Sequence, residues 1–434
     1  MLTAINLNNF KSYQNASLPL APLTLMIGAN ASGKTNAIEA FRFLCWLAQG
    51  ERLDKLRHKV QDSDQVIRGD VRTLGYLDSD RFGLGCYTDD ADWNELAIEL
   101  SVREDELHIS SESISSPSEK YPLYRIEQAS QGLTNNIRVS YNNFARGRNK
   151  PQIDCTDQIA VLTQLVSPAT FDRTHEKAQK VIPEVTERFS ALLENTLFLD
   201  PVPSQMREAS YPDKRLTGDC SNLSGVLYNL CRDENAKEQV VDFICSLPEQ
   251  DIKGLTFDAF SRGKYLLGLV ENFGERERLW TADLLSDGIL RVLAIAAALL
   301  SAEPGSTVVI EEVDNGVHPS RAHQLLETMR KQAQQRGIRL LLSTHNPALM
   351  DALPDEALGD VVFCYRSPED GSSKLVRLQD LPNYPGLVMQ GPLGGLVSRG
   401  VVDRFVKSSR TNETPEQRAR EAMEWLDSMR GNAS

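Results

Sequence analysis

The sequence predicts an α/β protein in which a mostly parallel sheet is combined with an antiparallel β subdomain and a helical insertion. Three observations predict this class. The chain opens with strands, a Gly-rich turn and a helix; short alternating runs follow from about residue 81; and strands alternate with helices again from about residue 266. Alternating β and α elements are typical of parallel sheets, whereas short runs between turns are typical of antiparallel ones.

The first 50 residues contain two predicted strands and one helix. Residues 2–7 alternate apolar and polar side chains, as in a half-buried strand. Residues 23–27 are continuously apolar, which is typical of a strand covered on both faces. A Gly-rich turn follows, and residues 36–44 then carry apolar side chains at helical spacing.

The middle of the chain changes character twice. Residues 81–141 form short alternating runs and predict an antiparallel sheet, with the Ser-rich segment 110–118 as a solvated hairpin loop. Residues 156–246 are helical in pattern, most clearly at 184–193. We therefore expect a core at 1–80 and 250–380, an antiparallel β subdomain at 81–155, a helical insertion at 156–249 and a C-terminal helical tail at 381–434.

The second half of the core alternates between the two element types. The expected elements are helix 284–300, strand 307–310, helix 320–335, strand 338–342 and a hairpin of 361–365 with 375–378. In the tail, Thr414 and Pro415 begin a further predicted helix as N-cap and first helical residue.

Composition excludes several classes of protein. The formal charge is −13, so nucleic-acid binding needs a local basic surface. No apolar run reaches the roughly 20 residues of a bilayer span, and the N-terminus lacks the pattern of a signal peptide. Seven cysteines are scattered without CxxC spacing, which argues against a disulfide framework and a zinc site. We expect a cytoplasmic protein without a membrane partner.

The strongest motif is the phosphate loop at residues 28–35, which fits GxxxxGK[ST] between a strand and a helix. Its glycines let backbone N–H groups point at phosphate oxygens, and the helix N-terminus adds positive character. Lys34 is placed to reach the β- and γ-phosphates, and Thr35 offers a hydroxyl to Mg²⁺. The expected nucleotide-binding residues of this segment are Gly28, Asn30, Ser32, Gly33, Lys34, Thr35 and Asn36.

Three further signals follow in the second half of the chain. A buried strand ends in Glu311 and Glu312, and one of these carboxylates can hold Mg²⁺ while the other orients or deprotonates the attacking water. Ser286 and Gly288 open an apolar helix, where Ser286 alone would be explained as an N-cap. His345 follows a strand that is expected to lie beside the phosphate loop, although a lone histidine is more often structural.

Together and in this order, the four signals resemble one family. They are similar to the ATPase heads of the ABC superclass, specifically the SMC, RecF and OLD-like branch of AAA family ATPases. GANASGKTN resembles Walker A, LLSDGILR the signature motif, VVIEEVDNGVHP Walker B and the D-loop, and LLLSTHNPALM the H-loop strand. The resemblance covers about residues 1–50 and 195–366. Ala31 replaces a glycine, and Glu311 replaces an aspartate, of many relatives.

The resemblance implies a P-loop NTPase fold of the ABC type and an ATPase reaction that yields ADP and phosphate. It also implies a head-to-tail dimer that traps two ATP molecules. The residue roles that it implies are Glu312 as catalytic base, Glu311 with Thr35 as Mg²⁺ ligands, His345 as γ-phosphate sensor, and Ser286 with Gly288 as contacts to the nucleotide of the other subunit.

The resemblance leaves the biological role open. The first hypothesis is an ATP-driven switch subunit that acts with DNA or with a separately encoded nuclease or effector, in phage defence or DNA repair. From the short stretch that follows the last core strand, we expect the ATPase component without the Toprim nuclease domain of OLD proteins. Residues 146–150 form a basic loop that could meet phosphates or could be an ordinary solvated loop. The alternatives are an ABC ATPase that powers a membrane transporter and a nucleotide-binding scaffold with negligible turnover.

Overall fold

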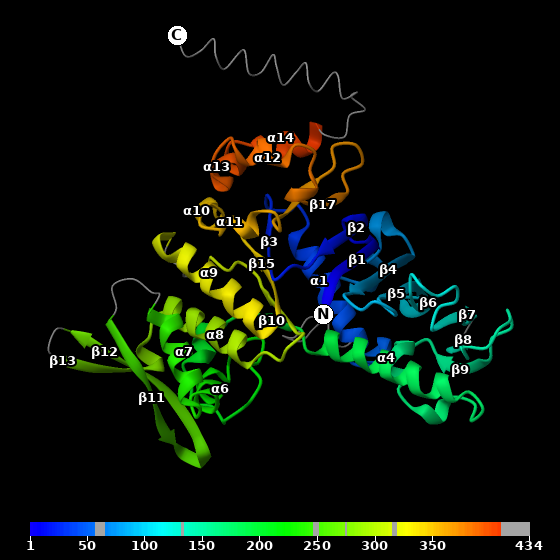
Figure 1. Cartoon of the computed structure of the whole chain (residues 1–434), viewed down its shortest axis with the longest axis horizontal. Helices are drawn as coiled ribbons and strands as arrows, with labels where there is room; N and C mark the ends of the chain where they lie inside the picture. Colours follow the sequence, from blue (N-terminus) through cyan, green and yellow to red (C-terminus); the bar gives the residue numbers. More distant parts are fainter. Residues whose placement is uncertain (57–65, 132–133, 246–250, 274–275, 315–318, 409–434) are drawn as a thin grey trace, which may run out of the picture.

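Three β-sheets and the helices that cover them make up the fold (Figure 1). The computed structural model describes residues 1–434 apart from 57–65, 132–133, 246–250, 274–275, 315–318 and 409–434. The helix predicted from Thr414 and the D-loop residues 315–318 lie outside the described residues.

A six-stranded sheet forms the centre and confirms the predicted parallel core. Five of its strands are parallel, and the last is antiparallel to its neighbour. In spatial order the strands are β10 (Leu197–Leu199), β14 (Thr307–Ile310), β15 (Arg339–Ser343), β3 (Leu23–Ile27), β16 (Val362–Arg366) and β17 (Ser373–Arg377). The strand that carries the phosphate loop, β3, therefore lies between two parallel neighbours.

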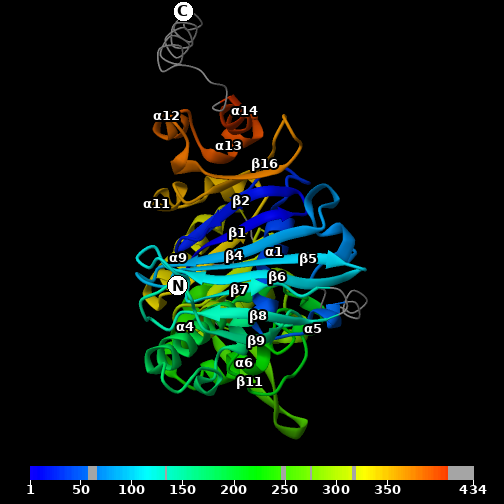
Figure 2. The same cartoon turned by 90° about the vertical axis from the view of Figure 1, so that its right-hand side faces the viewer.

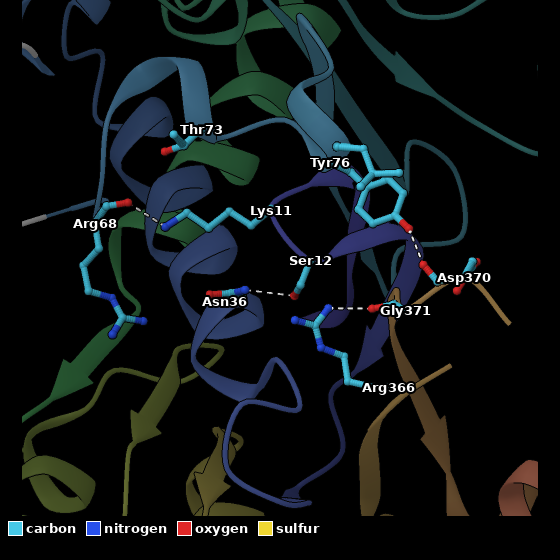
Figure 3. A pocket seen from close by; sticks show the side chains of 10 residues that line it. Lys11, Ser12, Asn36, Arg68, Thr73, Tyr76, Arg366, Asp370 and Gly371 are labelled. Atoms are coloured by element: carbon cyan, nitrogen blue, oxygen red, sulfur yellow. Dashed lines mark hydrogen bonds between the residues drawn. The ribbon is translucent and has the colours of Figure 1, made fainter. Parts of the chain in front are cut away.

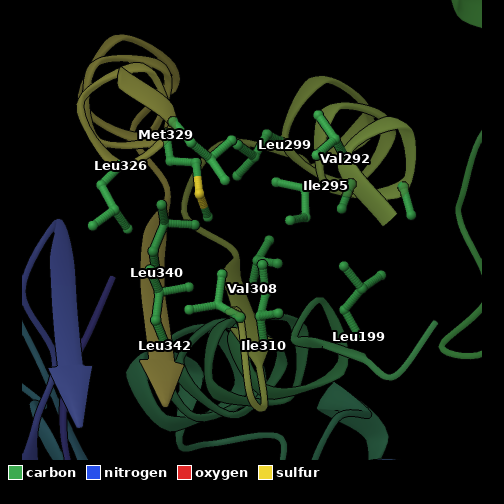
Figure 4. Packing of buried hydrophobic residues seen from close by; sticks show 14 of the residues in the cluster. Leu199, Val292, Ile295, Leu299, Val308, Ile310, Leu326, Met329, Leu340 and Leu342 are labelled. Atoms are coloured by element: carbon green, nitrogen blue, oxygen red, sulfur yellow. The ribbon is translucent and has the colours of Figure 1, made fainter. Parts of the chain in front are cut away.

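Helices cover both faces of this sheet, because alternate strand residues point to opposite sides. On one face, Leu25 of β3 belongs to the core shared with α8 (Asp287–Ser301) and α9 (Pro319–Arg336). On the other face, Met26 packs in the core of α1 (Lys34–Ala48). Figure 4 shows the first interface, where α8 and α9 residues face those of β10, β14 and β15. The labelled residues are Val292, Ile295, Leu299, Leu326, Met329, Leu340, Leu342, Val308, Ile310 and Leu199.

An eight-stranded antiparallel sheet packs against the outer side of α1. Figure 2 shows its strands across the middle of the view, in order downward from β2 to β9. They are β2 (Tyr13–Pro19), β1 (Leu2–Phe10), β4 (Arg81–Thr88), β5 (Glu95–Arg103), β6 (Glu106–Ser115), β7 (Tyr124–Gln128), β8 (Asn136–Tyr141) and β9 (Gln152–Thr156). The sequence predicted residues 1–80 as part of the core and, of these two strands, only the first, at 2–7, whereas β1 and β2 both belong to the antiparallel sheet.

The Ser-rich segment is not a loop, and this prediction was wrong. Residues 110–115 are the end of strand β6, in which Glu112 and Ile114 are fully buried while the serines beside them are more accessible. The alternation of apolar and polar side chains that is typical of a strand is not visible in the sequence here, because the polar Glu112 occupies an inward position. The solvent-facing serines then made the whole segment appear solvated.

The predicted helical insertion contains helices and one strand of the central sheet. Its helices are α3 (Val161–Gln164), α4 (Glu176–Glu194), α5 (Pro203–Met206), α6 (Leu223–Leu230) and α7 (Glu234–Cys245). Between α4 and α5, the short strand β10 pairs in parallel with β14 at the edge of the core. A third sheet, which the sequence did not predict, contains β11 (Asp251–Phe260), β12 (Lys264–Phe273) and β13 (Arg276–Thr281).

Two short helices, α10 (Pro347–Asp351) and α11 (Asp355–Leu358), lie in the chain between β15 and β16. Three more follow β17 and lie near the top of Figure 1. They are α12 (Tyr384–Val388), α13 (Leu393–Ser398) and α14 (Val401–Ser408). The Gly394 N–H donates to the Asp351 carboxylate at 2.6 Å, which joins α13 to α10. Single turns of 3-10 helix complete the chain: η1 (Leu53–Lys55), η2 (Val71–Thr73), η3 (Tyr76–Asp78), η4 (Pro168–Thr170), η5 (Ser261–Gly263), η6 (Ala282–Leu284) and η7 (Leu378–Asp380). Among the described residues, no helix has both the length and the apolar character needed to cross a bilayer.

A buried carboxylate joins the antiparallel sheet to the helical segment. The two oxygens of Glu112 accept hydrogen bonds from the Tyr124 hydroxyl and from the backbone N–H groups of Val161 and Leu162, each at 2.7 Å. Burial raises the pKa of Glu112 to about 7, although the three donors favour the ionised form. The structure therefore binds a proton here that the unfolded chain releases near pH 4.5.

We expect this group to make folding stability fall as the pH rises from about 4.5 to about 7, because the unfolded chain binds fewer protons in that window. Each pKa unit corresponds to about 1.4 kcal/mol. Glu112→Gln should lower stability overall, since its amide meets hydrogen-bond donors, and should flatten the profile between these pH values. Thermal unfolding of both proteins from pH 4 to pH 8 tests this. Glu106→Gln at the exposed start of the same strand is the control, and equal slopes for all three proteins would contradict the assignment.

Candidate functional site

The phosphate loop turns sharply at the carboxyl end of β3. Gly28, Ala31 and Gly33 all have positive φ, of 147°, 63° and 117°. A Cβ atom at Gly28 would lie 2.2 Å from the carbonyl oxygen of Cys364 in β16, so only glycine fits this turn. Ala31 adopts the left-handed conformation that a glycine would adopt more easily. The replacement of glycine at this position therefore leaves the turn in place.

Lys34, the first residue of α1, points back into this loop. Its ammonium donates hydrogen bonds to the carbonyl oxygens of Gly28 at 2.6 Å and Ala29 at 3.0 Å. Burial lowers the pKa of Lys34, while the Cys364 thiol and the carboxylate of Glu312 raise it. The partly buried cation is thus held by two weak acceptors that an anion can replace.

Buried polar groups from distant segments fix the loop from behind. The Ser373 hydroxyl of β17 lies 2.6 Å from the Ser32 carbonyl oxygen and 2.8 Å from the Ser12 hydroxyl. The Asn36 side-chain amide donates to Ser12 at 2.8 Å, and the Tyr13 hydroxyl donates to the Gly33 carbonyl at 3.1 Å. A Cβ atom at Gly33 would lie 2.4 Å from the Ser373 oxygen. We call Ser12, Asn36 and Ser373, with the Ser32 carbonyl, the hydroxyl cluster.

The two predicted acids follow β14 in a turn. Glu312 has a φ of 50°, and its N–H donates to the Ser343 hydroxyl of β15 at 3.1 Å. A glutamate in this conformation is strained, and such strain is concentrated at functional sites. Although burial lowers the pKa of Lys34, the charge of Glu312 opposes this shift, so the carboxylate and the ammonium interact electrostatically.

Glu311 lies beside the helix of the phosphate loop. Its carboxylate is 3.7 Å from the guanidinium of Arg42 in α1. Burial raises the pKa of Glu311, the charges of Arg42 and Arg68 oppose the shift, and Asp200 and Glu312 add to it. Asp200 directly follows β10, so it is a third acid near this edge of the sheet. No role was predicted from the sequence for Arg42 or Asp200.

The segment after β15 runs beside the phosphate loop. The Thr344 N–H donates to the Met26 carbonyl of β3 at 3.2 Å, and its hydroxyl donates to the Asp314 carboxylate at 2.6 Å. His345 follows immediately and is exposed. The carboxyl ends of β3, β14 and β15 therefore bring the phosphate loop, the acidic turn and the segment of His345 to one edge of the sheet.

The signature residues lie elsewhere. Ser286 is the N-cap of α8, where its hydroxyl accepts from the Ile289 N–H at 3.3 Å. The adjacent Asp287 accepts from Arg207 at 2.6 Å. Helices α8 and α1 cover opposite faces of the sheet. Within one chain, Ser286 and Gly288 therefore lie apart from the phosphate loop. Within the described residues, neither Ser286 nor Gly288 forms a hydrogen bond with residues 28–36.

A pocket of about 440 Å³ opens beside the first turn of α1 (Figure 3). It shares Ser12 and Asn36 with the hydroxyl cluster. The Tyr76 hydroxyl donates to the Asp370 carbonyl at 3.1 Å, which joins two sides of the pocket. The lining residues are Lys11, Ser12, Asn36, Arg68, Thr73, Tyr76, Leu77, Arg366, Asp370 and Gly371.

Three of these lining residues are cationic, and sequence analysis did not single out the pocket. Lys11 is 2.5 Å from the buried Glu39 carboxylate, and burial lowers the pKa of Lys11. Arg366 donates to the Gly371 carbonyl at 2.7 Å. The local sequence feature at the pocket is the FKSY turn between the first two strands. That turn contributes to a pocket only because segments far along the chain lie beside it.

The donor set near the loop fits a magnesium ion better than a softer metal. Thr35 is exposed on α1, and Arg42, two helical turns later, lies on the same face and contacts Glu311. A hydroxyl and a carboxylate are the oxygen donors that Mg²⁺ uses together with phosphate oxygens. In the described part of the chain, no cluster of three or more His, Cys, Asp or Glu residues could hold a metal ion by itself.

Comparisons with known proteins agree with this geometry. The family described as "AAA domain, putative AbiEii toxin, Type IV TA system" matches residues 23–351. The chain is 22% identical over 398 residues to a protein named OLD nuclease from Thermus scotoductus. That alignment covers 86% of this chain and 66% of the other protein. The chain is 38% identical over 71 residues to the DNA replication and repair protein RecF of Lachnoclostridium phytofermentans, which covers 16% of this chain and 19% of that protein.

The chain thus spans just under two thirds of the first relative and about a fifth of the second. Among solved structures, an SMC head bound to the C-winged helix domain of ScpA aligns with 13% identity and a TM-score of 0.49. That alignment covers 86% of this chain and 97% of the other.

The hydroxyl cluster can be tested with two neighbouring serines. Ser373→Ala and Ser372→Ala each remove one buried hydroxyl, but Ser372 bonds to Asp370 rather than to the loop. Both should lower the free energy of unfolding by about 1–3 kcal/mol. Only Ser373→Ala should weaken binding of a non-hydrolysable ATP analogue, by about three- to tenfold, because the loop loses a buried hydrogen bond. Calorimetric titration measures the affinities, and equal affinities for both variants would contradict this role.

Proposed function

The chain belongs to this family of AAA domains and is an ABC-type ATPase of the SMC, RecF and OLD kind. On that premise we propose that it hydrolyses Mg²⁺-bound ATP and closes a head-to-tail dimer. One observation supports the proposal most strongly. The loop with Lys34, the strained Glu312 and the segment of His345 follow three adjacent strands at one edge of a parallel sheet. Ligand sites of open α/β sheets lie at this edge.

The loop and the pocket beside it together match the parts of a nucleoside triphosphate. Phosphate oxygens accept from the loop N–H groups and from Lys34, whose ammonium exchanges its two carbonyl partners for charged oxygens. The remainder of the nucleotide extends over Asn36 toward the pocket. There, Tyr76 offers an aromatic ring, and Lys11 and Arg366 offer positive charge.

Thr35 and Glu311 are the proposed magnesium ligands. When bound, Mg²⁺ neutralises negative charge on the phosphate oxygens. The partly buried Glu311 carries a pKa raised by burial, so a cation beside it would favour the ionised form that Arg42 already supports.

Hydrolysis requires a positioned water molecule rather than a covalent intermediate. Glu312 orients this water and accepts its proton as the water oxygen bonds to the γ-phosphorus. The bond from that phosphorus to the oxygen bridging the β- and γ-phosphates breaks, and ADP and phosphate leave. His345 donates a hydrogen bond to the γ-phosphate, and Lys34 stabilises the charge that develops on it.

A second copy would complete the site. Ser286 and Gly288 lie on the far side of the sheet from α1, so in this proposal they contact the nucleotide that the other subunit holds. The γ-phosphate then supplies binding energy only to the closed dimer, and its hydrolysis reopens the dimer. Such a cycle suits a switch subunit that acts with DNA or with a nuclease or other effector, in phage defence or DNA repair.

Glu312→Gln should trap this closed dimer. Loss of the proton acceptor should reduce phosphate release by about 10²–10⁴-fold while ATP still binds. Light scattering with and without ATP should then show a stable dimer in the variant and a transient one in the wild type. An unchanged turnover rate would remove Glu312 from this role. Glu303→Gln, in the loop after α8, controls for the loss of one carboxylate.

A mixing experiment tests the shared site. Lys34→Ala removes the phosphate contact, and Ser286→Arg blocks the signature surface, so each variant alone should be inactive. In an equal mixture, half of randomly formed dimers contain one of each chain, and each such dimer holds one intact site. Phosphate release should recover to at most about one quarter of the wild-type rate. An inactive mixture in which both chains remain folded would contradict the head-to-tail arrangement.

A further inference from the structure

Three segments at one end of the antiparallel sheet form what we call the basic face. They are residues 119–121 before β7, 142–150 between β8 and β9, and 171–180, which end in the first turns of α4. They contain seven Lys or Arg residues against three acids, although the whole chain carries a charge of −13. The cations are Lys120, Arg146, Arg148, Lys150, Arg173, Lys177 and Lys180.

Side-chain contacts show that the three segments are neighbours in space. The Lys177 ammonium lies 4.3 Å from the centre of the Phe144 ring, and the Lys150 ammonium lies 5.0 Å from that of Tyr121. His175 is 2.9 Å from the Tyr141 hydroxyl at the end of β8. The basic face is therefore one continuous surface rather than three separate loops.

The cations of this face lack acidic partners. Across the described ranges, none of the seven forms a salt bridge, whereas cations on neighbouring strands do. Arg125 is 2.7 Å from Glu127, and Arg138 is 3.6 Å from Asp154. Asp172, an acid within the face, instead accepts hydrogen bonds from Thr174. The positive charge of this surface is thus not neutralised within the chain.

One lysine shapes the loop that presents the two exposed arginines. The Lys150 ammonium donates to the side-chain oxygens of Asn142 and Asn143 and to the Ala145 carbonyl, at 3.0–3.3 Å. Arg146 and Arg148 flank Gly147 in the exposed part of this loop. A guanidinium group binds phosphate with two parallel hydrogen bonds, and the guanidinium groups of both arginines are available here.

We propose that the basic face binds the phosphate backbone of double-stranded DNA without reading its sequence. The face offers charge but no free aromatic surface, because lysine ammoniums cover the Phe144 and Tyr121 rings. Base stacking, on which single-strand binding depends, is therefore not favoured. None of its described residues is a large exposed apolar side chain, as insertion into a membrane would need.

The face is separate from the nucleotide site. It lies toward the β9 edge of the antiparallel sheet, whereas β2, which follows the turn carrying Lys11 and Ser12, is at the opposite edge (Figure 2). Binding to DNA through this face needs no nucleotide, so it goes beyond the proposed ATPase cycle and can be tested without it.

Two matched double variants test the proposal. Arg146→Ala with Arg148→Ala removes two unpaired charges, and Arg125→Ala with Arg138→Ala removes two paired charges from the same sheet. Fluorescence anisotropy with a labelled 40-base-pair duplex, between 50 and 200 mM salt, measures affinity. The first pair should weaken binding by about tenfold or more and reduce the salt slope by about two, and the second should change affinity less than about twofold.

Several results would overturn the proposal. They are absence of binding by the wild type at 50 mM salt, equal losses for both pairs, and tighter binding of a single strand of the same length. Phosphate release without DNA should be unchanged in Arg146→Ala with Arg148→Ala, and Lys34→Ala should retain DNA binding. An inactive ATPase that still binds duplex through this face would contradict only the proposed ATP cycle.

Discussion

The nucleotide site depends on a cluster of buried hydroxyl groups behind the phosphate loop. Ser12 comes from the turn after β1, Asn36 from α1 and Ser373 from β17, and together they hold the Ser32 carbonyl. Ala31 has a positive φ, which is unfavourable for a residue with a side chain, whereas Gly28 and Gly33 adopt positive φ without strain. Ser12 and Ser373 are buried. Ser12 directly precedes a strand of the antiparallel sheet and Ser373 begins a strand of the central sheet, so the loop conformation and the packing of the two sheets stabilise each other.

Charge is distributed around this loop in a way that suits an anionic ligand and a cation together. Lys34 is partly buried with a lowered pKa, and Glu311 is partly buried with a raised one. Both groups are therefore held in surroundings that disfavour their charged forms. A triphosphate and a divalent ion supply the missing opposite charges, which gives a physical reason for ligand binding at this edge of the sheet.

The separation of the two helices matters as much as the loop. The alternation of side chains along β3 assigns α1 to one core and α8 to the other. Ser286 is an exposed N-cap whose hydroxyl satisfies its own helix. In a single chain this residue has an ordinary structural role, and a nucleotide-sensing role arises only if a second copy faces it.

The sequence by itself determined the elements whose signals are local. The continuous apolar run of β3, the glycines and lysine of the loop, and the strand ending in Glu311 and Glu312 were all found at their observed positions, because each depends on neighbouring residues. Tertiary structure alone decided the rest. It added β1 and β2 to the antiparallel sheet, turned the Ser-rich segment into part of β6, and placed β10 at the edge of the core.

The same distinction applies to the site. Lys11, Arg68, Tyr76 and Arg366 line one pocket only because three segments that are distant in the sequence meet there, and no sequence periodicity indicates such a meeting. Arg42 and Asp200 act on Glu311 for the same reason. Local sequence patterns specify which helix or strand a residue belongs to. Long-range packing specifies which charged side chains lie close enough to interact.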